Sequence, residues 1–438
     1  MKQLFYGGVH PAEHKEATEQ KPIQPLAKAP AQVVIPMSMH IGAPCKPTVQ
    51  KGDTVLVGQM IGATAGLGAP IHASVSGTVV AVEPRPGTGG VPTLSVVIEN
   101  DFQNTLSPDC KPRENVDALS SQEIIDIIRD AGCTGMGGAG FPTHVKISSA
   151  VGKADTIIVN GAECEPYITA DHRLMLEHGE KIIGGVRFIM KALQLDHAFI
   201  GIEDNKMNAV NHLKELVGDA KDITVQALRT RYPQGAEKQL IQAITGREVP
   251  QGGLPADAGV IVLNVTTVST IGKYLATGMP LVTKRLTVDG DAVAAPKNVE
   301  VLIGTPIQEV FAFCGLKEGV ELGKVIMGGP MMGVAVATMD EPVLKQNNGL
   351  LAFTAQKAAM PAPQPCIRCG RCIEGCPMGL APVQIAGAFT RKDTEELDKL
   401  CVDLCMLCGT CSYVCPAKRP VTQTMSLAKD FAAKEAKK

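Results

Sequence analysis

Two copies of one cysteine pattern lie near the carboxyl end of the sequence. The segments CIRCGRCIEGCP (366–377) and CMLCGTCSYVCP (405–416) both read C-x2-C-x2-C-x3-C-P. This spacing is typical of paired [4Fe–4S] sites, where three thiolates of one run hold one cluster and the fourth thiolate reaches the other. The predicted ligand sets are Cys366, Cys369, Cys372 and Cys415 for one cluster, and Cys405, Cys408, Cys411 and Cys376 for the second.

Zinc binding or purely structural thiols are the alternative interpretation of these runs. Zinc sites seldom repeat a four-cysteine run in phase with a trailing proline, so iron–sulfur clusters are favoured. Cys401 lies outside the pattern, and we expect a buried thiol there. Two clusters conduct single electrons, which requires a source and a sink for electrons.

A glycine-rich segment, GMGGAGFPTHVK (135–146), contains G-x-G-x-x-G. A dinucleotide-binding turn of this type follows a strand and opens a helix. Here helical spacing with a Ser start and a Gly stop predicts a helix over 120–132, and the apolar run 154–161 predicts a strand after the loop. The loop therefore fails as a dinucleotide turn. Successive backbone N–H groups bent by glycine still form an anion nest, to which Lys146 adds charge, so we expect it to hold a phosphate-bearing cofactor.

The segment NGAECEPYITADHRLM (160–175) follows the predicted strand directly. Open α/β sheets bind ligands at the carboxyl ends of their strands. Asn160, Glu163 and Glu165 are therefore expected to point into a crevice. A solvated acidic turn is the equally weighted alternative.

Composition restricts the class of protein. The 438 residues include 20% charged and 3% aromatic side chains, and the net charge is −2, which gives no indication of nucleic-acid binding. Fourteen cysteines without a signal peptide are more typical of a cytoplasmic chain than of a disulfide framework. The apolar stretches are too short to span a bilayer, so we expect contact with a membrane only through partner proteins.

The chain divides into segments of different character. We expect a polar arm (1–30), a β-rich domain (31–105), an α/β domain (120–278), a small domain of strands with one short helix (279–345), a cysteine-rich module (361–428) and a Lys-rich tail that forms a frayed, solvated helix (429–438). An Asn-, Pro- and Ala-rich linker is predicted over 345–365, and one helical segment over 382–400, between the cysteine runs.

The motifs GMGGAGFPTHVK, NGAECEPYITADHRLM, YPQGAEKQL (232–240) and LNVTTV (263–268) resemble those of the flavin- and NADH-binding subunit of respiratory complex I. In detail they are more similar to the C subunit family of the Rnf ion-translocating ferredoxin:NAD oxidoreductases, as are the twin cysteine runs. The resemblance covers nearly the whole chain.

The resemblance implies a multidomain α/β and α+β fold. Its parts would be an N-terminal biotinyl/lipoyl-like β-sandwich, a Rossmann-like α/β flavin domain, a β-grasp (SLBB-like) domain and a C-terminal bacterial-ferredoxin-like helical module. No lysine lies in the sandwich segment 65–76, where a carrier domain would show one at its hairpin tip. The sandwich is therefore expected to be a docking module.

The resemblance also implies a cofactor site. FMN would be held non-covalently, and NAD(H) would lie over it near Phe141, Glu165 and Glu237; the implied site also includes Gly235. The residues implied for FMN are Gly135, Gly137, Gly138, Gly140, Lys146, Asn160, Glu163, Asn264 and Thr267.

The sequence departs from the complex I pattern at several of its positions. Met136 stands where that subunit has Arg, Ala162 where it has Asp, and Ala236 where it has one of two paired Glu residues. The segment 249–255 lacks the aromatic residue expected beside the nucleotide. These losses weaken the expected NAD site more than the FMN site.

By resemblance, the function is NAD(H) oxidoreduction through FMN and two [4Fe–4S] clusters. The implied partners are the integral membrane and ferredoxin-like subunits of an Rnf complex that moves Na⁺ or H⁺, with ferredoxin acting through that complex, at the cytoplasmic face of the membrane. Two alternatives remain: a microcompartment cobalamin reductase, and a docking or electron-relay subunit without NAD binding. We expect His144 and His172 to be hydrogen-bonded structural residues, and Cys133 and Cys164 to be packed thiols.

Overall fold

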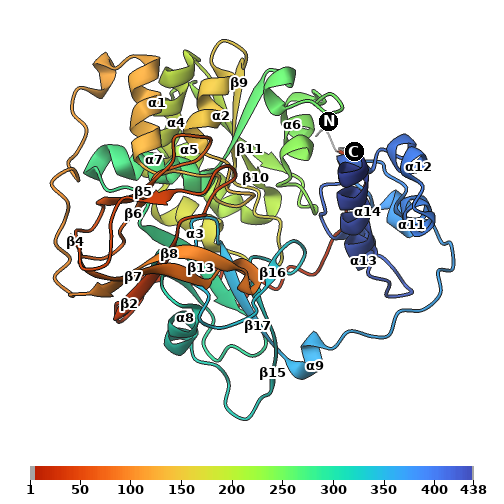
Figure 1. Cartoon of the computed structure of the whole chain (residues 1–438). Coiled ribbons are helices and arrows are strands. Elements are labelled where there is room, and N and C mark those ends of the chain that lie inside the picture. The colour runs from red at the N-terminus through yellow and green to blue at the C-terminus, as the bar shows by residue number, and fades with distance from the viewer. Residues whose placement is uncertain (1–4, 437–438) are drawn as a thin grey trace.

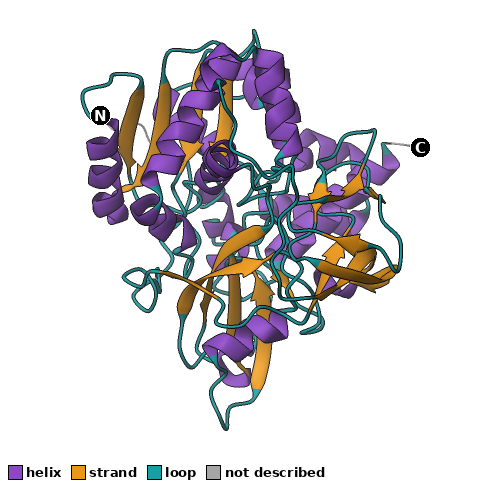
Figure 2. Cartoon of the chain, turned by 90° about the vertical axis from the view of Figure 1, so that its left-hand side faces the viewer, coloured by secondary structure: helices purple, strands orange, loops and turns teal. Residues whose placement is uncertain are grey.

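The computed structural model describes residues 5–436 and contains three groups of strands and a helical C-terminal module. The α/β domain lies at the top in Figure 1, the N-terminal strands lie in front of it, and the β-grasp-like sheet lies below. The C-terminal helices stand at the right-hand side, on the end of a long connection. Figure 2 separates the groups of strands and shows the helices gathered around the parallel sheet.

The N-terminal strands form two small sheets packed face to face. Alternating apolar residues such as Val33, Ile35, Val96 and Ile98 turn inward from paired strands and are fully buried, as expected for a sandwich. One sheet has the order β2-β8-β7-β4 and the other β3-β5-β6. Their bounds are β2 (Gln32–Pro36), β3 (Lys46–Pro47), β4 (Thr54–Val55), β5 (Met60–Ala63), β6 (Ile71–His72), β7 (Gly77–Pro86) and β8 (Pro92–Asn100).

The α/β domain is built on a parallel sheet of order β11-β10-β9-β12. The apolar runs TIIV and VIVL in neighbouring strands are buried on both faces, which is typical of parallel strands covered by helices. The strands are β9 (Thr156–Asn160), β10 (Ala198–Glu203), β11 (Ile223–Leu228) and β12 (Val260–Asn264); the helices are α1 (Ser121–Asp130), α2 (Thr143–Ala150), α3 (Ala170–Glu177), α4 (Gly179–Leu193), α5 (Met207–Val217), α6 (Glu237–Thr245) and α7 (Val265–Thr277).

The local sequence predictions around the glycine loop are confirmed. Ser120 caps α1 in a capping box with Glu123, and Gly132 follows the end of that helix with a φ of 67°. The loop leads from α1 into α2, and β9 comes only afterwards. The loop is thus a helix-to-helix connection.

The small domain is a six-stranded sheet of order β1-β14-β13-β17-β15-β16, packed on α8 (Ile307–Cys314). The sheet runs past the predicted boundary at residue 345, because β17 lies between β13 and β15. The linker prediction for 345–365 was therefore wrong over its first half. The strands are β1 (Ile23–Pro25), β13 (Thr283–Asp289), β14 (Lys297–Leu302), β15 (Leu322–Met327), β16 (Val334–Ala335) and β17 (Gly349–Thr354).

The N-terminal arm is fastened to three parts of the molecule. Its first described part contacts the cysteine-rich module, where the Gly8 N–H donates to the Gly375 carbonyl at 3.0 Å. Val9 forms an antiparallel bridge with Tyr232 of the α/β domain. Further along, β1 pairs in parallel with β14 and adds an edge strand to the small sheet.

The C-terminal module is made of helices and loops. The helix predicted over 382–400 is in fact two helices, because Lys392 takes a left-handed conformation between them. The tail is helical up to Glu435, as predicted, but it is the end of a longer helix that begins at Val421, and Ala432 is buried, so it is not wholly solvated; residues 437–438 lie outside the described part. The helices are α9 (Ala355–Ala358), α10 (Arg371–Glu374), α11 (Pro382–Arg391), α12 (Thr394–Lys399), α13 (Thr410–Tyr413) and α14 (Val421–Glu435).

Within residues 5–436, every helix is too short or too polar to cross a lipid bilayer.

Candidate functional site

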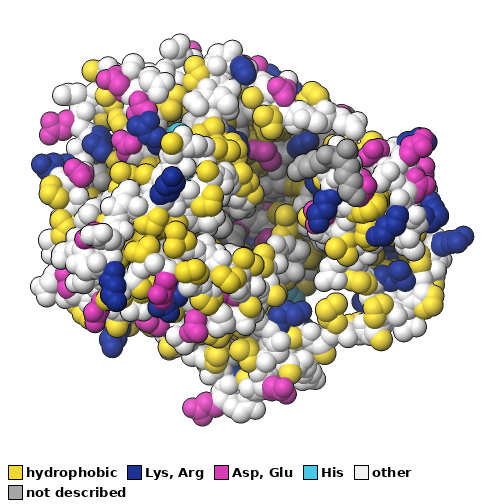
Figure 3. Space-filling view, in the orientation of Figure 1, with side chains coloured by type: hydrophobic (Ala, Val, Ile, Leu, Met, Phe, Trp, Pro, Cys, Tyr) yellow, Lys and Arg dark blue, Asp and Glu magenta, His cyan; other side chains and the backbone are white. Residues whose placement is uncertain are grey.

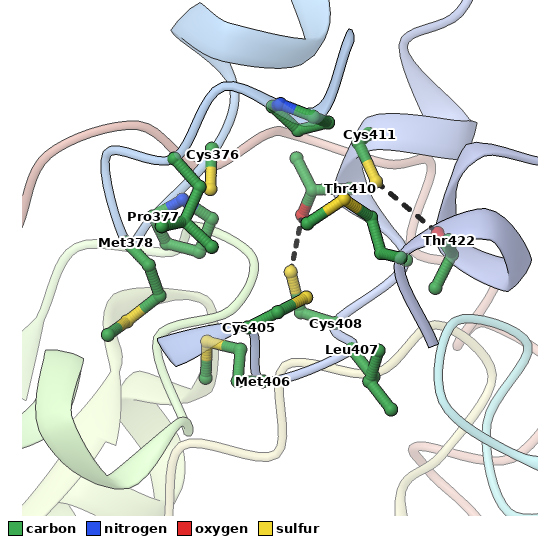
Figure 4. A pocket seen from close by; sticks show the side chains of 14 residues that line it. Cys376, Pro377, Met378, Cys405, Met406, Leu407, Cys408, Thr410, Cys411 and Thr422 are labelled. Carbon is green, nitrogen blue, oxygen red and sulfur yellow. Dashed lines mark hydrogen bonds between the residues drawn. The ribbon is translucent and has the colours of Figure 1, made fainter. Parts of the chain in front are cut away.

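The eight cysteines of the two runs line two separate cavities. The inner cavity has an empty volume of about 340 Å³ and is lined by Cys376, Cys405, Cys408 and Cys411 (Figure 4). The outer cavity, of about 1160 Å³ including its open mouth, is lined by Cys366, Cys369, Cys372 and Cys415. In both cavities three cysteines of one run meet the fourth cysteine of the other run. The structure thus brings together the two sets named from the spacing. Cys401 lines neither cavity, and it is only partly buried, whereas a buried thiol was expected.

The donor set suits clusters whose irons bind at separate corners. No three His, Cys, Asp or Glu side chains of the described chain converge on a point that could hold a single ion. The inner sulfurs instead surround a volume, with Cys408 Sγ 3.3 Å from Thr410 Oγ1 and Cys411 Sγ 3.5 Å from Thr422 Oγ1. Burial raises the pKa of the Cys411 thiol to about 12, so its thiolate would need a cationic partner such as cluster iron.

The inner cavity is packed against the α/β domain. The Tyr232 hydroxyl donates to the Cys408 carbonyl at 2.7 Å, and Gln239 Nε2 donates to the Pro377 carbonyl at 3.1 Å. Gly409 packs closely against the small domain: a Cβ there would lie 2.7 Å from the Met331 carbonyl, in the loop between β15 and β16. The inner cavity is therefore held from two sides by other domains.

The glycine loop forms a narrow, exposed turn. Its ends are joined by the Gly135 N–H, which donates to the Phe141 carbonyl at 2.8 Å. Gly137 has a φ of 117°, and a Cβ there would lie 2.9 Å from Asn264 Nδ2, so the position requires glycine. At Gly138 a Cβ would meet nothing within 4 Å. Gly137 and Gly138 are exposed, which leaves the middle of the loop open to a ligand.

The carboxyl ends of β9 and β12 bring two predicted site residues together, because Asn160 and Asn264 are paired in register. Asn160 Nδ2 donates to the Gly235 carbonyl at 2.7 Å, which adds a third predicted residue to the same edge. Thr267 lies beneath the loop, where its Oγ1 accepts from the Met136 N–H at 3.0 Å. Since Thr267 is fully buried, it supports the loop and does not face a ligand.

Lys146 and Glu237, predicted on opposite sides of the cofactor, form an ion pair with each other. The pair joins the start of α2 to the start of α6, and both side chains are partly exposed. Phe141 is also partly exposed. Figure 3 shows a hollow in the surface between the α/β domain and the C-terminal helices.

The two glutamate carboxylates of the segment 160–175 accept hydrogen bonds from backbone N–H groups of the chain. Glu163 accepts from the backbone N–H groups of Asp171 and His172, at 2.6 and 3.1 Å, at the start of α3. Glu165 accepts from the N–H groups of Met331 and Met332, at 3.0 and 2.9 Å. Both side chains are partly buried, so the solvated acidic turn is wrong. Neither carboxylate is free for a ligand in this arrangement.

Burial raises the pKa of the Glu165 carboxyl to about 7, and the two N–H donors only partly offset this. The same carboxylate joins the α/β domain to the loop 328–333, the loop against which Gly409 packs. Glu165 therefore links the α/β domain to the loop on which the cysteine-rich module packs.

Two residues of the site region were missed from the sequence. Asp171 accepts from Asn264 Nδ2 at 2.9 Å and from Thr266 Oγ1. It lies within the segment 160–175, which the sequence assigns to the site. Lys15 of the arm is buried, and its Nζ donates to the carbonyls of Glu163 and Ile168, each at 2.7 Å. No local pattern marks Lys15, because its partners lie about 150 residues away.

The predictions for two histidines and two cysteines near the site have mixed outcomes. His172 is structural, with Nε2 2.9 Å from Asn208 Oδ1, and Cys133 is fully buried. Cys164 is packed and its Sγ accepts from the Gly235 N–H at 3.3 Å. His144 differs from expectation, because its buried Nδ1 has no hydrogen-bond partner among the residues that the structure describes.

Comparison with protein families finds matches for three parts of the chain. Residues 3–103 match the RnfC barrel sandwich hybrid domain, residues 128–273 the Nuo51 FMN-binding domain, and residues 285–335 the SLBB domain. An NAD⁺-reducing [NiFe]-hydrogenase contains a chain of similar fold, with a TM-score of 0.50 and 18% identity over 75% of this chain and 63% of that one.

Three curated relatives match along more than 80% of their length. The chain is 48% identical to the C subunit of the Na⁺-translocating ferredoxin:NAD⁺ oxidoreductase complex of Acetobacterium woodii, over 87% of this chain and 86% of the relative. It is 46% identical to the proton-translocating counterpart of Clostridium ljungdahlii, over 88% and 84%. It is 40% identical to the C subunit of the ion-translocating oxidoreductase complex of Rhodobacter capsulatus, over 97% and 82%. The chain belongs to the family formed by the C subunits of these ion-translocating oxidoreductase complexes.

Proposed function

We propose that this chain exchanges electrons between NAD(H) and two [4Fe–4S] clusters through FMN, as the peripheral subunit of an ion-translocating ferredoxin:NAD⁺ oxidoreductase complex. The observation that carries the proposal is the contact of the inner cavity with the α/β domain through Tyr232 and Gln239. A cysteine-lined cavity placed there can exchange electrons with a cofactor bound at the carboxyl edge of the parallel sheet.

The chain's own residues suit FMN at the loop 135–146. Gly137 and Gly138 leave backbone open for a phosphate, and Asn160, Gly235 and Asn264 border the same edge. When bound, FMN supplies the exchange between two-electron hydride chemistry and single-electron transfer. Lys146 is the last residue of this segment, and a ligand phosphate would compete with Glu237 for its ammonium group.

The cysteine sets suit two [4Fe–4S] clusters bound in the crossed arrangement. The outer cluster would be held by Cys366, Cys369, Cys372 and Cys415, and the inner one by Cys376, Cys405, Cys408 and Cys411. The module that carries them is then ferredoxin-like. The inner cluster would exchange electrons with the flavin domain, and the outer cluster with a partner.

NAD(H) is expected over the flavin, with Phe141 and Glu237 as the partly exposed residues available to it. Glu165 is proposed as a link that holds the neighbouring loop, in place of the nucleotide contact expected from the sequence. The partners are the membrane and ferredoxin-like subunits of the complex, ferredoxin acts through them, and the site is the cytoplasmic face of the membrane. The relatives favour this assignment over a cobalamin reductase and over a relay without NAD binding.

The test is anaerobic reconstitution of the full chain with iron, sulfide and FMN, followed by visible spectra before and after NADH. The proposal predicts about eight iron atoms per chain, which is four per cluster, bleaching of the flavin, and then loss of the broad iron–sulfur absorbance. Bound flavin and clusters that ignore NADH but are reduced by dithionite would contradict it.

A further inference from the structure

The sandwich domain is attached both to the glycine loop and to the residue Gly132 that leads into it. Just before the loop, Lys345 of the small domain bridges the two parts: its Nζ donates to the Pro70 carbonyl of the sandwich at 2.6 Å and to the Gly132 carbonyl at 2.8 Å. At the end, the Ile41 N–H of the sandwich donates to the Gly140 carbonyl at 3.1 Å. These contacts connect the proposed FMN loop to a domain that is remote in sequence.

The middle of the loop is attached by a side chain. Met136 is 1% exposed, and it packs in the hydrophobic core of the sandwich, among residues such as Ile61 and Ile71. Its own N–H donates to Thr267 Oγ1, which lies on the opposite, α/β side. Met136 therefore joins the α/β domain through its backbone and the sandwich through its side chain.

Because its side chain is anchored in the sandwich core, Met136 can fix the conformation of the loop, which its glycine neighbours cannot do. Its neighbours Gly137 and Gly138 are exposed and have no side chain with which to fix the turn. A glycine-rich turn has many accessible backbone conformations, so a ligand must order it on binding unless the protein has already done so. Met136 is the only non-glycine side chain between Gly135 and Gly138.

We propose that Met136 is a positioning residue for FMN: by inserting into the sandwich core, it holds the loop in the conformation that receives the phosphate. The proposal rests on the proposed flavin site at this loop. It assigns the sandwich domain a direct part in flavin binding, in addition to any docking of partners.

The test compares two methionines of one core. Met37 is also 1% exposed in the sandwich core but is not part of the loop, so Met37→Ala removes the same side chain from the same core. FMN affinity of the full-length apoprotein is measured by quenching of flavin fluorescence, and stability by thermal denaturation without FMN. Met136→Ala is expected to weaken FMN binding at least about tenfold, and Met37→Ala less than about twofold, at similar losses of thermal stability.

Met136→Leu, which keeps an apolar side chain of similar volume, is expected to restore the affinity. Equal FMN affinity in Met136→Ala and the wild type, or equal losses in the two alanine variants, would overturn the inference. If Met136→Ala does not fold, Met136→Val is compared with Met37→Val by the same criteria. A wild-type protein that binds no FMN would instead contradict the proposed function itself.

Discussion

The inner and outer cysteine cavities share one ligand pattern but lie in different surroundings. In the inner cavity Cys376 and Cys408 are each 8% exposed, and the cavity is held by the α/β domain and by the loop 328–333. In the outer cavity Cys366 and Cys369 are exposed, and the neighbouring Ile367 is 69% exposed. A repeated motif thus places one site against the body of the protein and the other toward solvent, which suits one internal and one external exchange of electrons.

The largest expected effect comes from the equivalent glycines of the two runs. Gly370 and Gly409 have φ values of 78° and 82°, so alanine costs each about 1–2 kcal/mol in backbone strain. Only Gly409→Ala also forces a Cβ to within 2.7 Å of the Met331 carbonyl, whereas at Gly370 nothing lies within 4 Å. Overpacking of this kind adds about 1–3 kcal/mol. Thermal denaturation of the reconstituted protein should show a lower Tm for Gly409→Ala than for Gly370→Ala. Equal decreases of Tm in the two variants would contradict the contact between Gly409 and Met331.

Glu165, which holds the loop beside the inner cavity, should make stability depend on pH. Burial raises its pKa to about 7, above the value of about 4.3 for an unfolded chain. The folded protein thus favours the protonated carboxyl, and its contribution is fully present below about pH 4 and lost as the pH rises through about 7. The loss is at most about 4 kcal/mol, since the pKa differs by nearly three units and each unit corresponds to about 1.4 kcal/mol.

The measurement is the difference in Tm between the wild type and Glu165→Gln from pH 5 to pH 8. Relative to the variant, the wild type should lose stability as the pH rises. Exposed Glu318 serves as a control, and Glu318→Gln should leave the pH dependence unchanged. A wild type that gains stability relative to Glu165→Gln over this range would show that the carboxylate is stabilised in its charged form.

The difference in exposure should appear as a difference in cluster lability. The outer cluster is expected to be lost to a chelator about tenfold faster than the inner one, because local opening is easier where ligands are already exposed. Loss of iron–sulfur absorbance under EDTA should then be biphasic, and Cys369→Ser should remove the fast phase. A single phase in the wild type would show that burial does not distinguish the two sites.

The smallest expected effect concerns Tyr232. Tyr232→Phe removes its hydrogen bond to the Cys408 carbonyl, which costs about 1 kcal/mol. We expect a slightly lower Tm and slower reduction of the clusters by NADH. Tyr413, which is 48% exposed, provides the matched change, and Tyr413→Phe should alter neither quantity.

The parts of this protein that could be predicted from sequence are those with local signals. The capping box at Ser120, the apolar run of β9 and the spacing of the cysteines depend on residues close together in the chain. The linker prediction failed because the Asn-, Pro- and Ala-rich composition of 345–365 outweighed the short apolar run of β17.

The roles of the charged residues could not be predicted because their partners are remote. Glu165 was expected to face a nucleotide, but N–H groups 166 residues away bind its carboxylate. Lys15 and Met136 are likewise defined by carbonyls and core residues of other domains. From the sequence, Met136 was interpreted as the loss of the Arg that the complex I subunit has there. The structure explains an apolar residue at this position, because the side chain lies in the sandwich core.

The order of the two clusters is the central claim, and freeze-quench EPR after mixing with NADH tests it most directly. In Cys369→Ser, which disables the outer set, NADH should still reduce the flavin and the inner cluster. In Cys408→Ser the flavin should still be reduced, but the outer cluster should stay oxidised on the time scale of wild-type transfer. Reduction of the outer cluster at the wild-type rate in Cys408→Ser would contradict the claim.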